Sequence, residues 1–106
     1  MAETIVLTEA VYYILLSLFE PLHGYGIMQK VEVLSGSRVK LAAGTLYGAI
    51  NTLLEKQWIR ALPGEGNSRK KEYVILPDGK QAVALEISRL RELLANGEKI
   101  MGRLTQ

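Results

Sequence analysis

The sequence contains no cysteine, and it has only one histidine, one tryptophan and one phenylalanine among its 106 residues. The absence of cysteine excludes disulfides, thiolate metal sites and cysteine nucleophiles, and nothing indicates an oxidising compartment. His23 has no cysteine or carboxylate cluster with which to form a metal site or a catalytic triad. We therefore expect no bound metal or other cofactor and no enzymatic activity, because no nucleophile, base and oxyanion hole come together.

Long apolar runs are also missing. The segment 4–21 is rich in leucine, isoleucine and valine, but Thr8, Glu9, Ser17 and Glu20 interrupt it. No run reaches the ~20 residues that a membrane-spanning helix needs, and the basic start of a signal peptide is absent. We therefore expect a soluble, cytoplasmic protein with one compact core, which oligomerisation would help to stabilise at this small size.

Basic residues are concentrated in the middle of the chain. Residues 23–71 carry eight lysines and arginines against three acidic residues, although the formal net charge of the whole chain is only +2. The remaining residues carry five basic and eight acidic side chains. A basic middle between acidic ends suits a surface that meets a polyanion such as nucleic acid.

Hydrophobic periodicity predicts four helices and one β-hairpin. The expected helices run from a Thr8 N-cap to about residue 19, from about residue 25 to 34, through the stretch 41–59, and onward from Pro77. Residues 58–62 and 69–76 are expected to form the hairpin, and residues 38–42 a further short strand. This order predicts a mainly α fold with a small β-hairpin, a winged helix-turn-helix over residues 1–76, followed by a dimerisation helix over residues 77–106.

The last helix carries an apolar seam that resembles a coiled coil. Its members are Val83, Ile87, Leu90, Leu94, Met101 and Leu104. About 25 helical residues would reach roughly 37 Å, which is longer than a globule of this size can cover by itself. We therefore predict a homodimer with Ile87, Leu90, Leu94 and Met101 at its interface, and an end or kink at Asn96-Gly97.

The third helix has a packing face and a polar face. Leu46, Ile50, Leu53 and Leu54 form the apolar stripe, while Thr45, Tyr47, Gly48 and Asn51 face the other way and Gly44 lies at the helix start. Inside a helix, glycine is less favourable than alanine by roughly 1 kcal/mol of helix stability. Two glycines at these positions therefore indicate a specific role. Either they let a phosphate approach the positive helix N-terminus, or they let a neighbouring helix pack closely.

Three consecutive cations, Arg69, Lys70 and Lys71, follow the turn of the hairpin. Such residues could each neutralise a phosphate and make nucleic-acid binding strongly salt-dependent. Charge runs in hairpins are also commonly only solvated surface. His23 is expected to cap or orient the turn before the second helix, and Trp58 is expected to anchor the core.

The chain resembles PadR-type transcriptional regulators in three segments. They are HGYGIMQKVE (23–32), AGTLYGAINTLLEKQWI (43–59) and SRKKEYVILPDGKQ (68–81), which follow the family's order and separation. The length is similar to that of the small subfamily with a single C-terminal helix. The resemblance implies a winged-helix homodimer that binds a pseudo-palindromic operator in double-stranded DNA and usually represses, often releasing DNA when a small hydrophobic or aromatic effector binds.

The resemblance also implies which residues lie at the DNA. Tyr25 of the GYG turn, with Gly44, Thr45 and Tyr47 of the third helix, are expected there, and Arg69, Lys70 and Lys71 of the wing are expected at the phosphate backbone. Three departures from the family pattern stand out. Ala42 and Ala43 provide no capping side chain, Gln57 stands where glycine is usual, and the last helix has no tryptophan on which a planar drug could stack.

A second interpretation stays open. The same winged-helix scaffold could serve as a protein-interaction module that does not read DNA, because a fold does not by itself fix a function.

Overall fold

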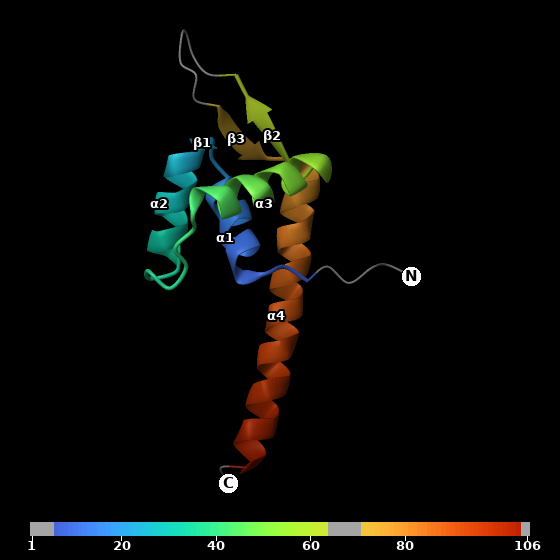
Figure 1. Ribbon diagram of the computed structural model, residues 1–106. Helices are drawn as coiled ribbons and strands as arrows, with labels where there is room; N and C mark the ends of the chain where they lie inside the picture. The colour runs from blue at the N-terminus through green and yellow to red at the C-terminus, as the bar shows by residue number, and fades with distance from the viewer. Residues whose placement is uncertain (1–5, 64–70, 105–106) are drawn as a thin grey trace.

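The computed structural model describes residues 6–63 and 71–104, with extents of 64 × 35 × 21 Å (Figure 1). In chain order the elements are α1 (Glu9–Ser17), β1 (Leu22–His23), α2 (Gly24–Leu34), α3 (Ala43–Glu55), β2 (Ile59–Leu62), β3 (Glu72–Ile75) and α4 (Pro77–Leu104). The described residues thus form four helices and a three-stranded sheet, which confirms the expected winged-helix order. None of these helices is both long enough and apolar enough to cross a bilayer.

The sheet contains one strand that the sequence did not predict. It is antiparallel in the order β1-β3-β2, with Leu22 opposite Tyr73 and Ile59 opposite Ile75. β1 has only two residues, so no local alternation could reveal it. The predicted strand at 38–42 is wrong, because these residues connect α2 to α3 and the Val39 backbone N–H donates to Ser35 Oγ at 2.9 Å rather than to a neighbouring strand.

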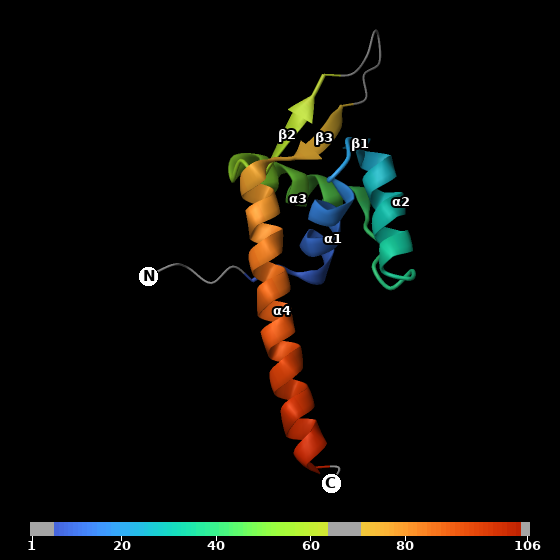
Figure 2. The same cartoon turned by 180° about the vertical axis from the view of Figure 1, so that it is seen from behind.

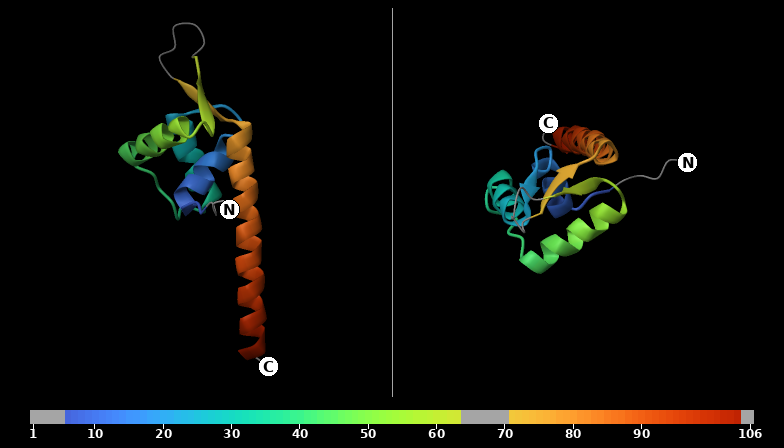
Figure 3. Two further views of the ribbon diagram at one scale, coloured as in Figure 1. Left: turned by 90° about the vertical axis from the view of Figure 1, so that its right-hand side faces the viewer. Right: turned by 90° about the horizontal axis from the view of Figure 1, so that it is seen from above.

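The core lies where α1, α2 and α3 meet the sheet and the start of α4. Its buried apolar residues include Ile14, Leu15, Leu18, Ile27, Val31, Leu46, Ile50, Leu53, Ile59, Ile75 and Val83. In the view from above, α1 lies between α3 and α4 (Figure 3). Because α3 places its apolar stripe against this core, its opposite face is left on the surface.

Local signals set several element boundaries. Thr8 is the N-cap of α1, since the Val11 backbone N–H donates to Thr8 Oγ1 at 3.2 Å, and Pro77 begins α4 as expected. Gln57 follows α3 with a positive φ of 60° in the position where glycine would be more comfortable. The predicted end or kink at Asn96-Gly97 is wrong, because α4 continues to Leu104 among strong helix formers.

The first half of helix α4 packs against the rest of the domain, and its second half extends beyond it (Figures 1 and 2). Its first turns pack into the core through Val83, and Ile87 lies at the edge of that core. Farther along, Leu94 and Met101 are each 61% exposed. The second half of α4 therefore presents apolar side chains that the chain itself does not cover.

Candidate nucleic-acid interface

The face of α3 that points away from the core carries the residues predicted to meet DNA. Leu46, Ile50 and Leu53 are buried, whereas Thr45, Tyr47, Gly48 and Asn51 are exposed, as is Gly44 at the start of the helix. This division confirms the two faces read from the sequence. The exposed face of α3 is therefore polar and carries small side chains. Strands β2 and β3 lie next to α3, at the end of the molecule opposite the C-terminus (Figure 1).

The two glycines of α3 face open space. A Cβ built on Gly44 or on Gly48 would meet no atom of the chain within 4 Å. Close packing of a neighbouring helix therefore does not explain them within this chain. Glycine disfavours a helix by about 1 kcal/mol at each such position, and the packing of the described residues requires neither glycine.

The N-terminus of α3 has no side-chain cap. Ala42 occupies the N-cap position without a side-chain hydrogen bond, and no acidic residue lies in the first turn. The first backbone N–H groups of a helix lack intrahelical partners, and the helix dipole adds partial positive charge there. With Gly44 in the first turn, these donors are open to an approaching anion such as a phosphate.

Tyr47 connects α3 to the start of α2. Gly24 lies directly beneath it, so that a Cβ on Gly24 would come within 3.0 Å of Tyr47 Cζ and closer still to the hydroxyl oxygen. Burial, with a smaller contribution from nearby Tyr47, raises the pKa of Tyr73 in β3. The Tyr47 side chain therefore lies against the start of α2 and near Tyr73 of β3, while 46% of the residue stays exposed.

The turn before α2 is fixed by His23. Its Nδ1 accepts a hydrogen bond from the Gly26 backbone N–H at 3.2 Å, which confirms the predicted capping role. Tyr25, one residue into the helix, is 65% exposed. Tyr25 and Tyr47 thus border the same surface, since Gly24 links the start of α2 to the middle of α3.

The basic character of this region is partly neutralised within the chain. Lys30 pairs with Glu20 at 2.6 Å, Lys40 lies 4.0 Å from Glu32, and Arg38 pairs with Glu9. Lys71, at the start of the returning wing strand, is exposed. Arg69 and Lys70 were predicted to meet the phosphate backbone but lie outside the described residues.

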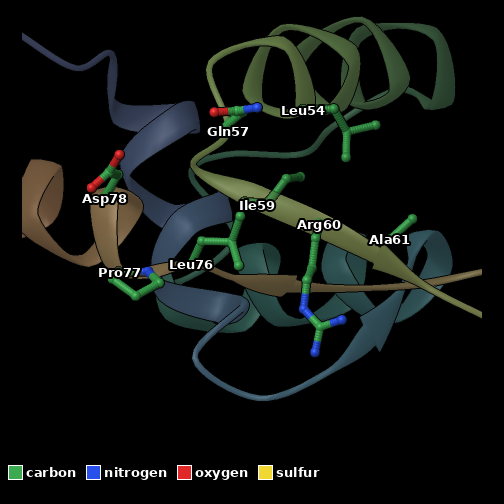
Figure 4. Close-up of a pocket in the computed structure, with 8 residues that line it drawn as sticks. All are labelled: Leu54, Gln57, Ile59, Arg60, Ala61, Leu76, Pro77 and Asp78. Carbon is green, nitrogen blue, oxygen red and sulfur yellow. The ribbon is translucent and has the colours of Figure 1, made fainter.

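A broad hollow of about 540 Å³ lies behind this interface. Its walls come from the end of α3, from β2 and from the start of α4, and comprise Leu54, Gln57, Ile59, Arg60, Ala61, Leu76, Pro77 and Asp78 (Figure 4). None of the predicted DNA-contacting residues lines it. Among the described residues, no group of three or more histidine, cysteine or acidic side chains could hold a metal ion.

The sequence pattern did not predict the role of Gly24. Gly24 was treated only as part of the HGYGI segment, although its missing side chain is what lets Tyr47 lie against α2. The contact itself joins residues 23 positions apart, so local pattern could not reveal it.

The first three helices, the small sheet and the exposed face of α3 define a winged-helix fold. Residues 13–85 match the transcriptional regulator PadR-like family, which is more than half of the chain. The chain therefore belongs to that family, whose members are transcriptional regulators and not enzymes.

Individual proteins are also similar to this chain. An uncharacterised 37.1 kDa protein in transposon Tn4556 of Streptomyces fradiae is 37% identical over 73 residues, which are 69% of this chain but only 20% of that protein. The chain thus spans about a fifth of the length of this relative. A PadR family transcription regulator from Clostridium difficile shares the fold with a TM-score of 0.66, at 22% identity over 91% of this chain and 98% of that one.

A further similar structure contains DNA. Bacillus subtilis PadR in complex with operator DNA superposes with a TM-score of 0.58, at 21% identity over 71% of this chain and 44% of that chain. At this identity the likeness shows the shared fold.

Proposed function

We propose that this protein is a sequence-specific DNA-binding transcriptional regulator that acts as a homodimeric repressor at a pseudo-palindromic operator. The observation that carries the proposal is the exposed face of α3, with open glycines and an uncapped N-terminus beside the wing. In winged-helix proteins the third helix enters the major groove. The solved complex of Bacillus subtilis PadR with operator DNA supports the choice of DNA as partner.

The residues divide into backbone contacts and candidates for base contacts. Gly44 and Thr45 suit phosphate contacts, because their backbone N–H groups lack intrahelical partners and Thr45 adds a hydroxyl donor. Gly48, whose N–H is bonded within the helix, contributes only clearance through its absent side chain. Asn51, one turn farther along the exposed face, is suited to adenine, whose N6 and N7 an amide side chain can engage. Tyr25 and Tyr47, which are exposed on the side of this surface toward α2, are further proposed contacts with DNA.

The wing supplies further phosphate contacts in this proposal. Lys71 is exposed and stands at the base of the wing, and Arg69 and Lys70 precede it in the sequence. Each cation that neutralises a phosphate releases a counterion and makes binding more salt-dependent.

The proposed organisation is a DNA-binding unit over residues 1–76 and a dimerisation helix over residues 77–106. It is supported by the uncovered apolar residues of α4, Leu90, Leu94 and Met101, with Ile87 at the edge of the core. We include a cytoplasmic location, because the partner is DNA, and a response to a small hydrophobic or aromatic effector, which the family resemblance implies. Stacking on a tryptophan of α4 is not its route, because the single tryptophan is Trp58.

Fluorescence anisotropy with labelled DNA from upstream of the protein's own gene tests this function. We expect saturable binding that weakens steeply with salt and is much tighter than binding to random DNA of the same length. Asn51→Ala should reduce the preference for the specific DNA by roughly 5- to 100-fold, since one bidentate base contact contributes about 1–3 kcal/mol. Asn96→Ala on α4 is the matched control and should bind like the wild type.

Equal and weak binding to both DNAs at low salt would contradict the proposal. If the protein were then still dimeric, the interpretation as a protein-interaction module would be favoured.

A further inference from the structure

A hollow of about 240 Å³ lies between α2 and the segment that leads into α3. Its walls comprise Tyr25, Met28, Gln29, Glu32, Lys40 and Leu41. Tyr25, Gln29 and Glu32 follow one another along a single face of α2 at helical spacing. Lys40 stands two residues before Ala42, the N-cap of α3. The hollow therefore connects the proposed DNA surface, which Tyr25 borders, to one acidic and one basic side chain.

The backbone beside Lys40 is held against the end of α2. The Ser35 hydroxyl donates to the Glu32 carbonyl oxygen at 3.2 Å and accepts from the Val39 backbone N–H at 2.9 Å. Val39 and Leu41, on either side of Lys40, pack against the core. Because both neighbours are turned inward, the Lys40 side chain is left on the surface, where 71% of it is exposed.

Lys40 and Glu32 form the loosest ion pair among the described residues. Lys40 Nζ lies 4.0 Å from Glu32 Oε1, whereas Lys30 approaches Glu20 to 2.6 Å. An exposed pair beyond hydrogen-bonding distance contributes little to stability. The Lys40 ammonium can therefore leave this carboxylate for another anion at little cost in free energy.

We propose that Lys40 exchanges the Glu32 carboxylate for a phosphate of bound DNA, so that Glu32 lowers the affinity for DNA by competing with that phosphate. The inference rests on the DNA-binding function proposed above. A phosphate at the hollow would meet the Lys40 ammonium, with the Tyr25 hydroxyl and the Gln29 amide as further donors. Glu32 offers no donor and has a charge of the same sign as the phosphate, so the two anions compete for one cation.

The competition sets the strength of DNA binding and not its sequence preference. A phosphate carries no sequence information, so the competing carboxylate weakens binding to operator and random DNA alike. Phosphate contacts supply essentially all of the affinity for non-operator DNA, which a genome offers in large excess. Glu32 therefore limits how much of the regulator is retained on DNA outside its operator.

Fluorescence anisotropy of the full chain tests the exchange, with labelled DNA from upstream of its own gene and a random duplex of the same length. Glu32→Gln removes the competing charge and should tighten binding to both duplexes by roughly three- to tenfold at low salt. This gain should shrink at high salt, where the charges are screened. Glu98→Gln, on the second half of α4, changes the net charge equally and is the matched control that should bind like the wild type.

A double-mutant cycle measures whether Glu32 acts through Lys40. Lys40→Gln alone should weaken binding and flatten the slope of log K against log salt concentration by about 0.9 for each protomer bound, and Lys40→Arg should keep most of that slope. In the Lys40→Gln chain, Glu32→Gln should change the affinity by less than about twofold, because the cation for which it competes is gone. Thermal unfolding of each variant checks that the fold is intact, as expected for two exposed side chains.

The outcomes separate the exchange from the function on which it rests. A wild-type slope for Lys40→Gln would mean that Lys40 does not reach a phosphate. An equal gain from Glu32→Gln with and without Lys40 would mean that the carboxylate repels DNA directly, and either result overturns the exchange alone. Wild-type protein that binds neither duplex would instead contradict the DNA-binding function itself.

Discussion

The phenol of Tyr47 in α3 lies directly over the Cα of Gly24 at the start of α2. A side chain on Gly24 would overlap the end of the tyrosine ring, so the glycine allows Tyr47 to lie against the start of α2. Gly24 is buried, and the hydroxyl of Tyr47 lies close enough to Tyr73 to contribute to raising its pKa. The contact therefore couples α2, α3 and the wing strand at one point.

Gly24→Ala should disturb the contact between α2 and Tyr47. The added methyl would come within 3.0 Å of Tyr47 Cζ and closer to its hydroxyl, so the ring must move. We expect a loss of at most about 1 kcal/mol in the free energy of unfolding, less than at an overpacked core site, because the half-exposed ring can swing outward, together with weaker operator binding. Urea denaturation and fluorescence anisotropy measure the two effects. Combining Gly24→Ala with Tyr47→Ala should recover part of the stability but not the binding, and an unaltered Gly24→Ala protein would show that the contact is unimportant.

Gly48→Ala should have the opposite effect on stability. A methyl group there meets no atom of the chain and gives α3 a better helix former, so we expect the free energy of unfolding to rise by about 0.5–1 kcal/mol. If the open surface serves close approach of DNA, operator affinity should fall although the protein becomes more stable. Thermal unfolding and anisotropy on the same samples make the test. Increased stability with unchanged affinity would mean that this glycine does not face the DNA.

The sequence predicted what depends on periodicity and missed what depends on contacts between distant residues. The two faces of α3 follow from spacing alone, and so do its buried Leu46 and Ile50. By contrast, β1 is defined only by its pairing with β3, and Gly24 only by the tyrosine above it. The pairing of Lys30 with Glu20 could not be seen either, so the charge count overestimated the free positive charge. The proposed DNA contacts and the dimer stay predictions.

Glu86 should make stability depend on pH. Hydrogen bonds from the Arg89 guanidinium are the main cause that lowers the pKa of Glu86; burial opposes them, and the Leu7 backbone N–H adds to the lowering. Because the folded pKa lies below the unfolded one, the carboxylate stabilises the fold at pH values above the unfolded pKa. This contribution is lost as the pH falls through the folded pKa.

Glu86→Gln should therefore cost about 1–3 kcal/mol of unfolding free energy at pH 7, where it leaves Arg89 without its counter-charge. The difference from wild type should shrink below about pH 4, where the wild-type carboxyl is also protonated in the unfolded chain. Glu20→Gln is the matched control, since its pair with Lys30 is exposed and should contribute little to stability. Denaturation at pH 7, 4 and 3 measures both variants, and a difference that does not change with pH would contradict the role of this charge.

Lys71 allows the wing contact to be measured apart from the fold, because it is exposed and has no ion-pair partner among the described residues. A cation that neutralises a phosphate contributes about 0.9 to the slope of log K against log salt concentration for double-stranded DNA. Lys71→Gln should therefore weaken DNA binding at low salt and flatten that slope by about 0.9 for each protomer bound. The effect should be similar on operator and random DNA, because a phosphate carries no sequence information. Lys99→Gln on α4 is the matched control and should leave the slope unchanged. If both variants gave the wild-type slope, Lys71 would not touch the phosphate backbone, and the wing would have to contact DNA through other residues.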